Sequence, residues 1–121
     1  MSNELDATEF SRRWVAAWNA RDVAAVLAHF HDDVVFSSPL AAQLFPETGG
    51  VVRGKEALRA YWAEGLKRLP DLHFTVEAVY AGVGSVVINY RNHRGQLVNE
   101  VLVFDGDLVR EGHATYLRQD G

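Results

Sequence analysis

The sequence predicts a single domain of the α+β class, with helices first and a hairpin-linked antiparallel sheet after them. Two observations support this. Before Pro70, apolar residues recur at helical spacing in three segments. From Leu72 onward, apolar and polar residues alternate in four segments that short turns separate. With 121 residues, the chain is long enough for one hydrophobic core but not for two, so residues 1–121 are expected to form one domain.

The helices are predicted from their apolar stripes and their end signals. The first covers residues 6–19, where large apolar side chains fall on one face. Asp22 is suited to cap a second, shorter helix, whose apolar side extends to Phe30. The third covers residues 55–69 and is stopped by Pro70.

A short strand is predicted over residues 34–38, because Pro39 cannot donate to a sheet ladder. The following segment, residues 39–52, combines apolar side chains with Pro46 and two glycines and is predicted to be irregular. A long loop in a small domain is often functional. This one is either a flap over a pocket or a contact for a second subunit.

Four strands are predicted over residues 72–80, 85–91, 96–104 and 108–117. The alternation in the first of them places one set of side chains on a common face: Leu72, Phe74, Val76, Ala78 and Tyr80.

Composition and charge exclude several functional classes. The net charge is −4, whereas nucleic acids and anionic membranes require a basic surface. The absence of cysteine excludes disulfides and thiolate chemistry. No stretch approaches the roughly 20 apolar residues that span a bilayer, and the N-terminus has no apolar signal core. We therefore expect a cytoplasmic protein that binds neither nucleic acid nor membrane.

Two patterns resemble cofactor or metal sites without fitting them. The segment from Gly49 to Lys55 nearly matches a phosphate-binding loop, but Glu56 stands where that loop needs Ser or Thr for magnesium. His29 and His31 lie close to two aspartates, but residues two apart point to opposite sides of a helix. No cofactor and no metal are expected.

Glu100 is the candidate for acid–base chemistry. It shares a strand face with Val98, Leu102 and Phe104, and if this face is concave, these neighbours desolvate the carboxyl group and raise its pKa. A carboxylic acid that stays protonated near neutrality can donate to a developing enolate. The alternative is that Glu100 faces outward and pairs with an arginine on a neighbouring strand, Arg91 or Arg110.

The last predicted strand divides its side chains in the same way. Arg110, Gly112, Ala114 and Tyr116 share one face, and His113 lies on the other. Aromatic residues on the helices either line a ligand cavity or fill the core. Asn89 and Arg91 share a strand face and would bind a polar ligand end only if that face were concave.

The order of elements around His31–Pro39, with a polar residue just before Pro39, resembles the nuclear transport factor 2-like superfamily. This superfamily has a cone-shaped, cystatin-like α+β fold, in which a curved sheet wraps around helices and encloses an apolar pocket. It includes ketosteroid isomerases and SnoaL-type polyketide cyclases. The broad SnoaL-like group is the closer likeness.

The resemblance also implies positions for functional residues. Alignment on the turn at Arg21, on Pro39 and on Phe104 places Trp14 at the isomerase's oxyanion tyrosine. Ser38 then stands at its general-base aspartate, and Glu100 at its acid hydrogen-bond donor. Since a serine hydroxyl is no base at neutral pH without an activating partner, steroid isomerisation by that mechanism is not expected.

The predicted site thus has Glu100, Ser38 and Trp14 as catalytic groups. The predicted ligand-binding residues are Trp18, Phe36, Tyr61, Trp62, Val98, Leu102, Phe104 and Tyr116.

Three functions remain open. The first is an isomerase or cyclase acting on an apolar carbonyl compound by proton transfer. The second is a non-catalytic carrier or sensor of an apolar small molecule. The third is an association module with a solid core. A homodimer through the outer sheet face, which carries Val101 and Val103, is compatible with all three.

Overall fold

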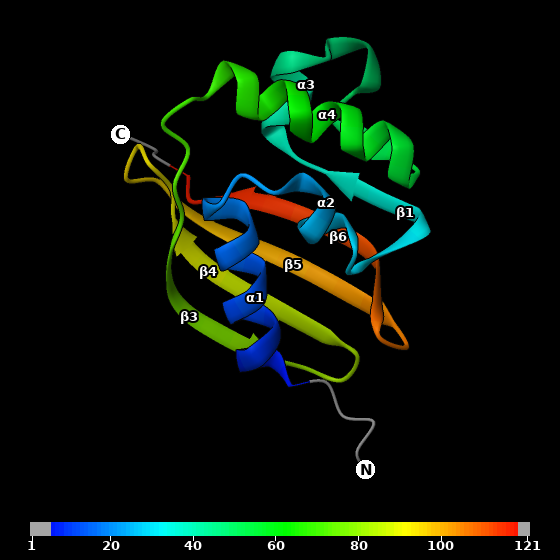
Figure 1. The fold of residues 1–121 in the computed structure, drawn as a ribbon, viewed down its shortest axis with the longest axis vertical. Coiled ribbons are helices and arrows are strands. Elements are labelled where there is room, and N and C mark those ends of the chain that lie inside the picture. The colour runs from blue at the N-terminus through cyan, green and yellow to red at the C-terminus, as the bar shows by residue number, and fades with distance from the viewer. Residues whose placement is uncertain (1–5, 119–121) are drawn as a thin grey trace.

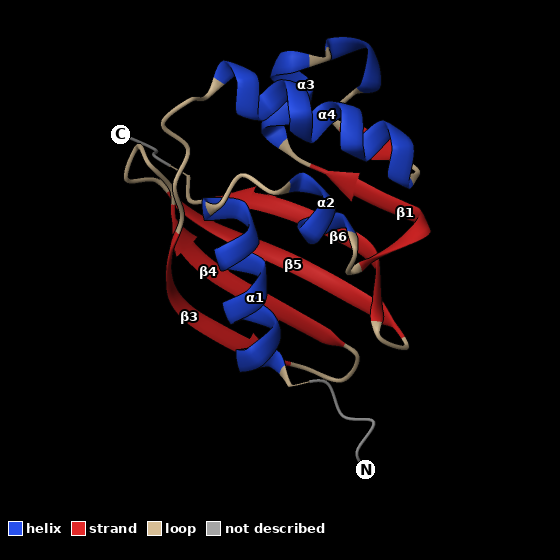
Figure 2. Cartoon of the chain, viewed as in Figure 1, coloured by secondary structure: helices blue, strands red, loops and turns tan. Residues whose placement is uncertain are grey.

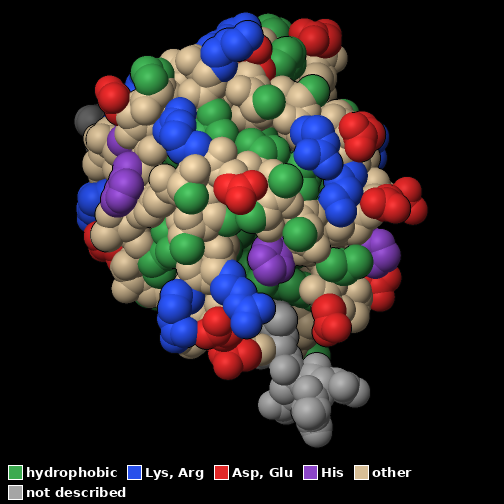
Figure 3. Space-filling model, in the orientation of Figure 1, with side chains coloured by type: hydrophobic (Ala, Val, Ile, Leu, Met, Phe, Trp, Pro, Cys, Tyr) green, Lys and Arg blue, Asp and Glu red, His purple; other side chains and the backbone are tan. Residues whose placement is uncertain are grey.

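The computed structural model of the chain describes residues 6–118. It confirms the α+β prediction: helices cover one face of a curved, six-stranded sheet, as Figure 1 shows. On the face seen in Figure 3, acidic and basic side chains are interspersed, so that this face has no continuous basic surface.

The first two helices begin where aspartates cap them. Helix α1 covers Ala7–Asn19, and its N-cap Asp6 accepts a hydrogen bond from the backbone N–H of Glu9. Helix α2 covers Val23–Leu27, and Asp22 accepts one from the N–H of Ala25. Each cap satisfies an N–H group that the first helical turn leaves without an intrahelical partner.

The segment between α2 and the third predicted helix is more regular than the sequence indicates. Strand β1 covers Phe30–Ser37 and so includes Phe30, which had been assigned to the helix. The predicted loop contains helix α3 (Pro39–Leu44), a 3₁₀ turn (Pro46–Thr48) and strand β2 (Val51–Arg53). Pro39 fits the first turn of α3, where no backbone N–H is needed, and the Ser38 side chain caps the helix.

Helix α4 covers Lys55–Arg68, and the remaining strands are β3 (Thr75–Ala81), β4 (Ser85–Arg91), β5 (Leu97–Asp105) and β6 (Leu108–Tyr116). The strand order is β2-β1-β6-β5-β4-β3, as can be followed in Figure 2. Strands β1 and β6 pair in parallel, and the other neighbours are antiparallel.

Irregularities in three strand pairs bend the sheet. The register shifts between Phe30 and Val35 in β1, between Val76 and Ala78 in β3, and between Val103 and Phe104 in β5. A bulge increases local twist and bends its strand. The sheet therefore curves around α1 and α4, and its concave face meets the helices.

Two of these shifts also correct the predicted faces. Tyr80 was expected on the same face as Phe74, which is buried, yet Tyr80 is 62% exposed because the shift in β3 intervenes. Arg110 was expected beside Ala114, yet it is exposed and Val109 takes the buried position. Strict alternation cannot anticipate an extra residue in a strand.

Two polar side chains at the end of α1 fix the neighbouring elements. The Asn19 amide donates to the carbonyl of Phe74 and accepts from its N–H, both at 2.9 Å, which ties α1 to the start of β3. Arg21 donates to the carbonyls of Leu66 and Leu69 at 2.8 and 3.1 Å. It thereby satisfies carbonyl groups that the C-terminus of α4 leaves without intrahelical partners.

Gly112→Ala should destabilise the protein by about 1–3 kcal/mol, because a Cβ at this position would lie 2.9 Å from the Phe36 ring and 3.2 Å from Leu102. Gly65→Ala is the matched control. Its Cβ would meet nothing within 4 Å, and alanine favours the helix by up to about 1 kcal/mol. Urea unfolding of both variants checks this, and equal stabilities would contradict the close packing at Gly112.

Candidate active site

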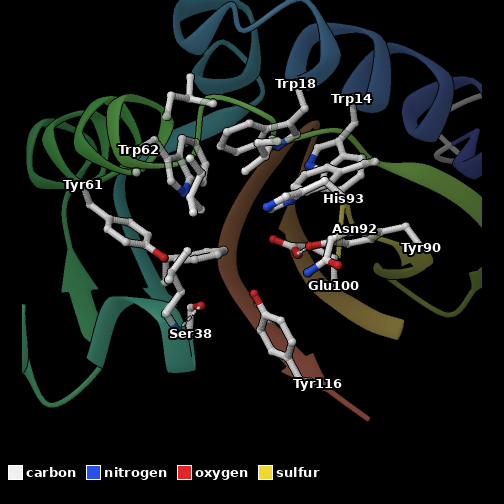
Figure 4. Close-up of a pocket in the computed structure, with 18 residues that line it drawn as sticks. Trp14, Trp18, Ser38, Tyr61, Trp62, Tyr90, Asn92, His93, Glu100 and Tyr116 are labelled. Carbon is white, nitrogen blue, oxygen red and sulfur yellow. Dashed lines mark hydrogen bonds between the residues drawn. The ribbon is translucent and has the colours of Figure 1, made fainter. Parts of the chain in front are cut away.

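A pocket lies between the concave face of the sheet and helices α1, α3 and α4. It holds about 620 Å³ of space not filled by protein atoms, its mouth included. Its wall is mostly apolar and aromatic, and the polar groups on it are few (Figure 4). The aromatic and polar side chains on this wall include Trp14, Trp18, Ser38, Tyr61, Tyr90, His93, Glu100 and Tyr116.

Glu100 occupies the middle of the pocket floor. Its strand neighbours are Ile88 on β4 and Ala114 on β6, so it lies inside the sheet and not at an edge. The residue is 4% exposed, and the Tyr90 hydroxyl donates to its Oε1 at 3.0 Å. The outward alternative, pairing with Arg91 or Arg110, is therefore excluded.

Burial changes the acidity of this carboxyl group. Loss of hydration raises the pKa of Glu100 from 4.5 to about 7, and the hydrogen bond from Tyr90 partly opposes the rise. The group is thus divided between its acid and base forms near neutral pH. This is the condition under which one residue can both take and return a proton efficiently.

Two indole N–H groups on α1 have no partner within the part of the chain that the structure describes. Trp14 is 1% exposed and Trp18 is 6% exposed, and the Nε1 atoms of both are buried without a hydrogen bond. The Nδ1 of His93 is also buried and unpartnered. Figure 4 shows these nitrogens near the space in front of Glu100. Because unpaired buried donors are costly, they mark where a ligand acceptor could bind.

Hydroxyl groups form the opposite side of the pocket. Burial raises the pKa of Tyr116 to about 12 and that of Tyr61 above its usual value, so both phenols stay protonated at neutral pH. The Ser38 Oγ accepts from the N–H of Leu40 at 3.1 Å and lies across the cavity from Glu100 in Figure 4. Each of these hydroxyls keeps a proton that it can donate to a ligand.

The structure brings all three predicted catalytic residues, Glu100, Ser38 and Trp14, to one pocket. Five of the predicted ligand-binding residues also line it: Trp18, Phe36, Tyr61, Trp62 and Tyr116. Their roles stay predictions, since position alone does not assign catalysis.

The other three predicted ligand-binding residues do not line the pocket. Leu102 and Phe104 lie toward the opposite end of β5, where the Phe10 ring packs edge-on against Phe104 at 5.1 Å. Val98 is fully buried between its cross-strand partners Tyr90 and Tyr116, which line the pocket in its place. The cavity occupies only one end of the concave face. Alternation along a strand predicts which face a residue lies on, but not which end of that face is hollow.

The polar residues on the convex face are engaged elsewhere. Arg91 pairs with Glu77, and Asn89 donates to Asn99. His113 lies on this face as expected, with Nδ1 2.6 Å from the Ser37 hydroxyl and Nε2 3.2 Å from Glu111. None of these side chains reaches the pocket.

Among residues 6–118, no group of three or more His, Asp or Glu side chains is arranged to hold a metal ion. Within the same range, no helix is long and apolar enough to cross a membrane.

Sequence reasoning missed Tyr90 and His93. Tyr90 was available from the pattern, because it alternates with the buried residues Val86 and Ile88 on β4. His93 follows the strand in a hairpin, and nothing in the local pattern indicates that the turn folds back over the pocket.

The family model that matches the chain is that of the SnoaL-like domain, over residues 11–118. A SnoaL-like protein of unknown function from Burkholderia thailandensis is 46% identical with a TM-score of 0.87, over 93% of this chain and 94% of that one. The chain is thus related to that protein in sequence as well as in fold. No curated protein matches significantly.

Two further solved structures share the fold at low identity. A nuclear transport factor 2-like protein from Cytophaga hutchinsonii is 13% identical, with a TM-score of 0.72 over 97% of this chain and 95% of that one. TerC, crystallised with polyporic acid, is 15% identical, with a TM-score of 0.75 over 92% and 91%. These likenesses confirm the predicted fold, whereas the relation to ketosteroid isomerases stays a prediction.

In the native protein, the free energy of unfolding should fall as pH rises, because of the raised pKa of Glu100. Glu100→Gln should not show this fall. Between about pH 4.5 and 7, the folded protein holds a proton on Glu100 that the unfolded chain releases, because the folded pKa is the higher one. The free energy of unfolding therefore falls across this window as pH rises, by about 3 kcal/mol, and stays low above it. Glutamine can still accept from Tyr90 but carries no charge.

Urea unfolding at pH 4.5, 7 and 8.5 measures this difference. The free energy of unfolding of Glu100→Gln, relative to that of the native protein, should increase as pH rises. Glu77→Gln, which removes an exposed carboxylate paired with Arg91, should show no such gain. Parallel pH profiles for the native protein and Glu100→Gln would rule out a raised pKa.

Proposed function

The chain belongs to the SnoaL-like domain family, and we propose that it is a cofactor-independent enzyme that moves a proton on an apolar carbonyl compound. Glu100 is the proton carrier in this proposal, and Trp14, Trp18 and Ser38 are hydrogen-bond donors. The observation that carries it is the placement of one carboxyl group, with a pKa of about 7, beside unpaired indole N–H groups in an apolar pocket.

The proposed reaction begins with the charged form of Glu100. Its carboxylate takes a proton from the carbon next to the substrate carbonyl, the electron pair of that C–H bond forms a C=C bond, and the π pair of the carbonyl moves to its oxygen. The indole N–H groups donate to this oxygen as its negative charge grows. In a conjugated enolate, the protonated Glu100 then returns the proton to the far carbon, which gives an isomer. Alternatively, the enolate carbon attacks a second carbonyl and closes a ring, the electron pair of that C=O bond moves to its oxygen, and Glu100 gives its proton to this oxygen.

The indoles supply less acidity than a phenol would, but they need not be ionised to act. Their surroundings strengthen the interaction instead. Both nitrogens are buried, and charge interactions are stronger in a site that excludes water. Because the donors have no competing partner among the described residues, they need not exchange one hydrogen bond for another when the enolate forms.

The pocket favours a flat ligand. Its walls include the faces and edges of aromatic rings, with Trp18 and Trp62 packed edge to face at 4.9 Å. Gly65 on α4 adds to this, since a side chain there would enter open space beside the pocket. TerC was crystallised with the small molecule polyporic acid, which supports small-molecule binding by this fold.

We also propose a homodimer through the convex face of the sheet. Val101 and Val103 lie there with partial exposure, opposite the buried Glu100 and Leu102. A partly exposed apolar sheet face gains stability when a second copy covers it.

The test of the proposed reaction is hydrogen exchange on a simple ketone. The native protein should accelerate exchange of the α-hydrogens of 2-tetralone in D₂O, measured by proton NMR, and the rate should rise with pH through about 7 as Glu100 ionises. Glu100→Gln should lower the rate by about 10²-fold or more. Glu77→Gln, on the outer face, should leave it unchanged.

The carrier alternative has a distinct outcome in the same experiment. If 2-tetralone binds, as seen by saturation-transfer NMR, but its α-hydrogens exchange no faster than in buffer, the acid–base proposal is wrong and a non-catalytic carrier is favoured. Exchange that persists in Glu100→Gln would assign the chemistry to another residue.

For the dimer, Val103→Arg should yield monomers in light scattering, because a charge is costly to bury in an apolar interface. Val83→Arg is the control. Val83 is a fully exposed apolar residue in the turn between β3 and β4, and its change should leave the mass unaltered. A dimer that survives Val103→Arg must use another surface.

A further inference from the structure

The pocket opens into a second, outer hollow at its mouth. Five residues line both spaces, so the two are continuous: Leu40, Leu69, Asn92, His93 and Tyr116. The outer hollow is bounded by α3, by the C-terminal end of α4 and by the hairpin that joins β4 to β5. A ligand longer than the inner pocket would therefore extend along this hairpin.

The two spaces differ in their chemistry. The inner pocket is largely apolar and holds the carboxyl group of Glu100. The outer hollow adds Gln43, Arg94 and Gln96. Among the described residues that line it, Arg94 is the one lysine, arginine, aspartate or glutamate. The mouth of the pocket is thus positively charged in a protein whose net charge is −4.

The hairpin holds the backbone of Arg94 in a fixed position. The Asn92 Oδ1 accepts from the N–H groups of Arg94 and Gln96, both at 3.0 Å, and the Asn92 amide donates to the Gln96 side chain at 2.9 Å. Gly95 supplies the left-handed conformation that the turn needs, with φ at 77°. The base of the Arg94 side chain is therefore ordered before any ligand binds.

The guanidinium of Arg94 makes no hydrogen bond or salt bridge within the described part of the chain. The other arginine of this hairpin differs, since Arg91 donates to Glu77 and to the carbonyl of Gly95. The positive charge of Arg94 also lowers the pKa of Tyr116, against the effect of burial, and both residues line the outer hollow. The guanidinium of Arg91 is thus engaged within the fold, whereas that of Arg94 is available to a ligand.

We propose that Arg94 binds a carboxylate at the outer end of an elongated aromatic ligand, whose flat apolar part occupies the inner pocket. This rests on the proposed function, because it assumes that the inner pocket takes a ligand. A guanidinium can bind a carboxylate through two parallel hydrogen bonds, which fixes orientation as well as charge. The ligand then enters with its carbonyl or phenol end toward Glu100 and its acidic end at the mouth.

The test compares two probes that share one ring system. 2-Naphthol carries a phenol only, whereas 6-hydroxy-2-naphthoic acid carries the same phenol and a carboxylate at the far end of the rings. Calorimetry at pH 7 should show that the native protein binds the acid about tenfold more tightly than 2-naphthol. Since Arg94 is exposed, this advantage should shrink as salt is raised from 0.05 to 0.5 M.

Arg94→Ala should remove the advantage of the acid and leave the affinity for 2-naphthol unchanged. Arg94→Lys should keep part of it, because a single ammonium retains the charge without the paired geometry. Arg110→Ala, which removes an exposed arginine from β6 that does not line either space, should alter neither affinity. Thermal melting by circular dichroism confirms that each variant is folded.

The outcomes separate this proposal from the one on which it rests. If 2-naphthol binds but the acid binds no more tightly, the Arg94 proposal is overturned. It is also overturned if Arg94→Ala leaves the difference in affinity between the two probes intact. In both cases, ligand binding in the inner pocket is still supported. If neither probe binds the native protein, the ligand pocket itself is overturned and the Arg94 proposal falls with it.

Discussion

The packing of Trp14, Phe74 and Tyr90 into one aromatic cluster is the interaction on which the rest of the structure depends. The Trp14 and Phe74 rings stack at 5.6 Å, and Tyr90 contacts both, at 5.3 and 4.4 Å. These rings join α1 to β3 and β4. The Tyr90 hydroxyl also donates to the buried carboxyl group of Glu100. Tyr90 thus takes part both in helix packing and in setting the acidity of Glu100, whose pKa burial raises and this hydrogen bond lowers.

The bends in the sheet and the divergence of the helices together create the pocket. Where α1 and β5 lie close, the rings of Phe10 and Phe104 fill the space between them. At the other end, Asn19 holds the start of β3 and Arg21 holds the end of α4. The chain between these points lines the pocket with Leu69, Leu72 and Phe74. Gly65 leaves room on the α4 wall at some cost in helix propensity. The cavity is thus maintained by polar contacts at its rim and by a missing side chain in its wall.

The inner pocket and its mouth would recognise different parts of a ligand. Inside, a neutral or singly charged carboxyl group and unpaired N–H donors suit an oxygen whose charge changes during reaction. Outside, Arg94 offers a permanent charge that screening by solvent keeps modest. Such an arrangement would orient a ligand by its two ends, because Glu100 lines the inner pocket and Arg94 lines the outer hollow.

The sequence by itself determined three of the four helices and five of the six strands that the structure describes, since apolar periodicity and capping residues are local signals. It grouped Glu100 with Val98, Leu102 and Phe104 on one face of a strand, but only the fold decided that Glu100 points inward. It also indicated the three residues Trp14, Ser38 and Glu100 that the fold brings to one pocket. Only the tertiary structure decided which end of the sheet stays open. Leu102 and Phe104 were misplaced for that reason, and Tyr80 and Arg110 because bulges reverse the alternation. His93 and Arg94 reach the pocket through a hairpin whose direction depends on distant packing, which no local pattern contains.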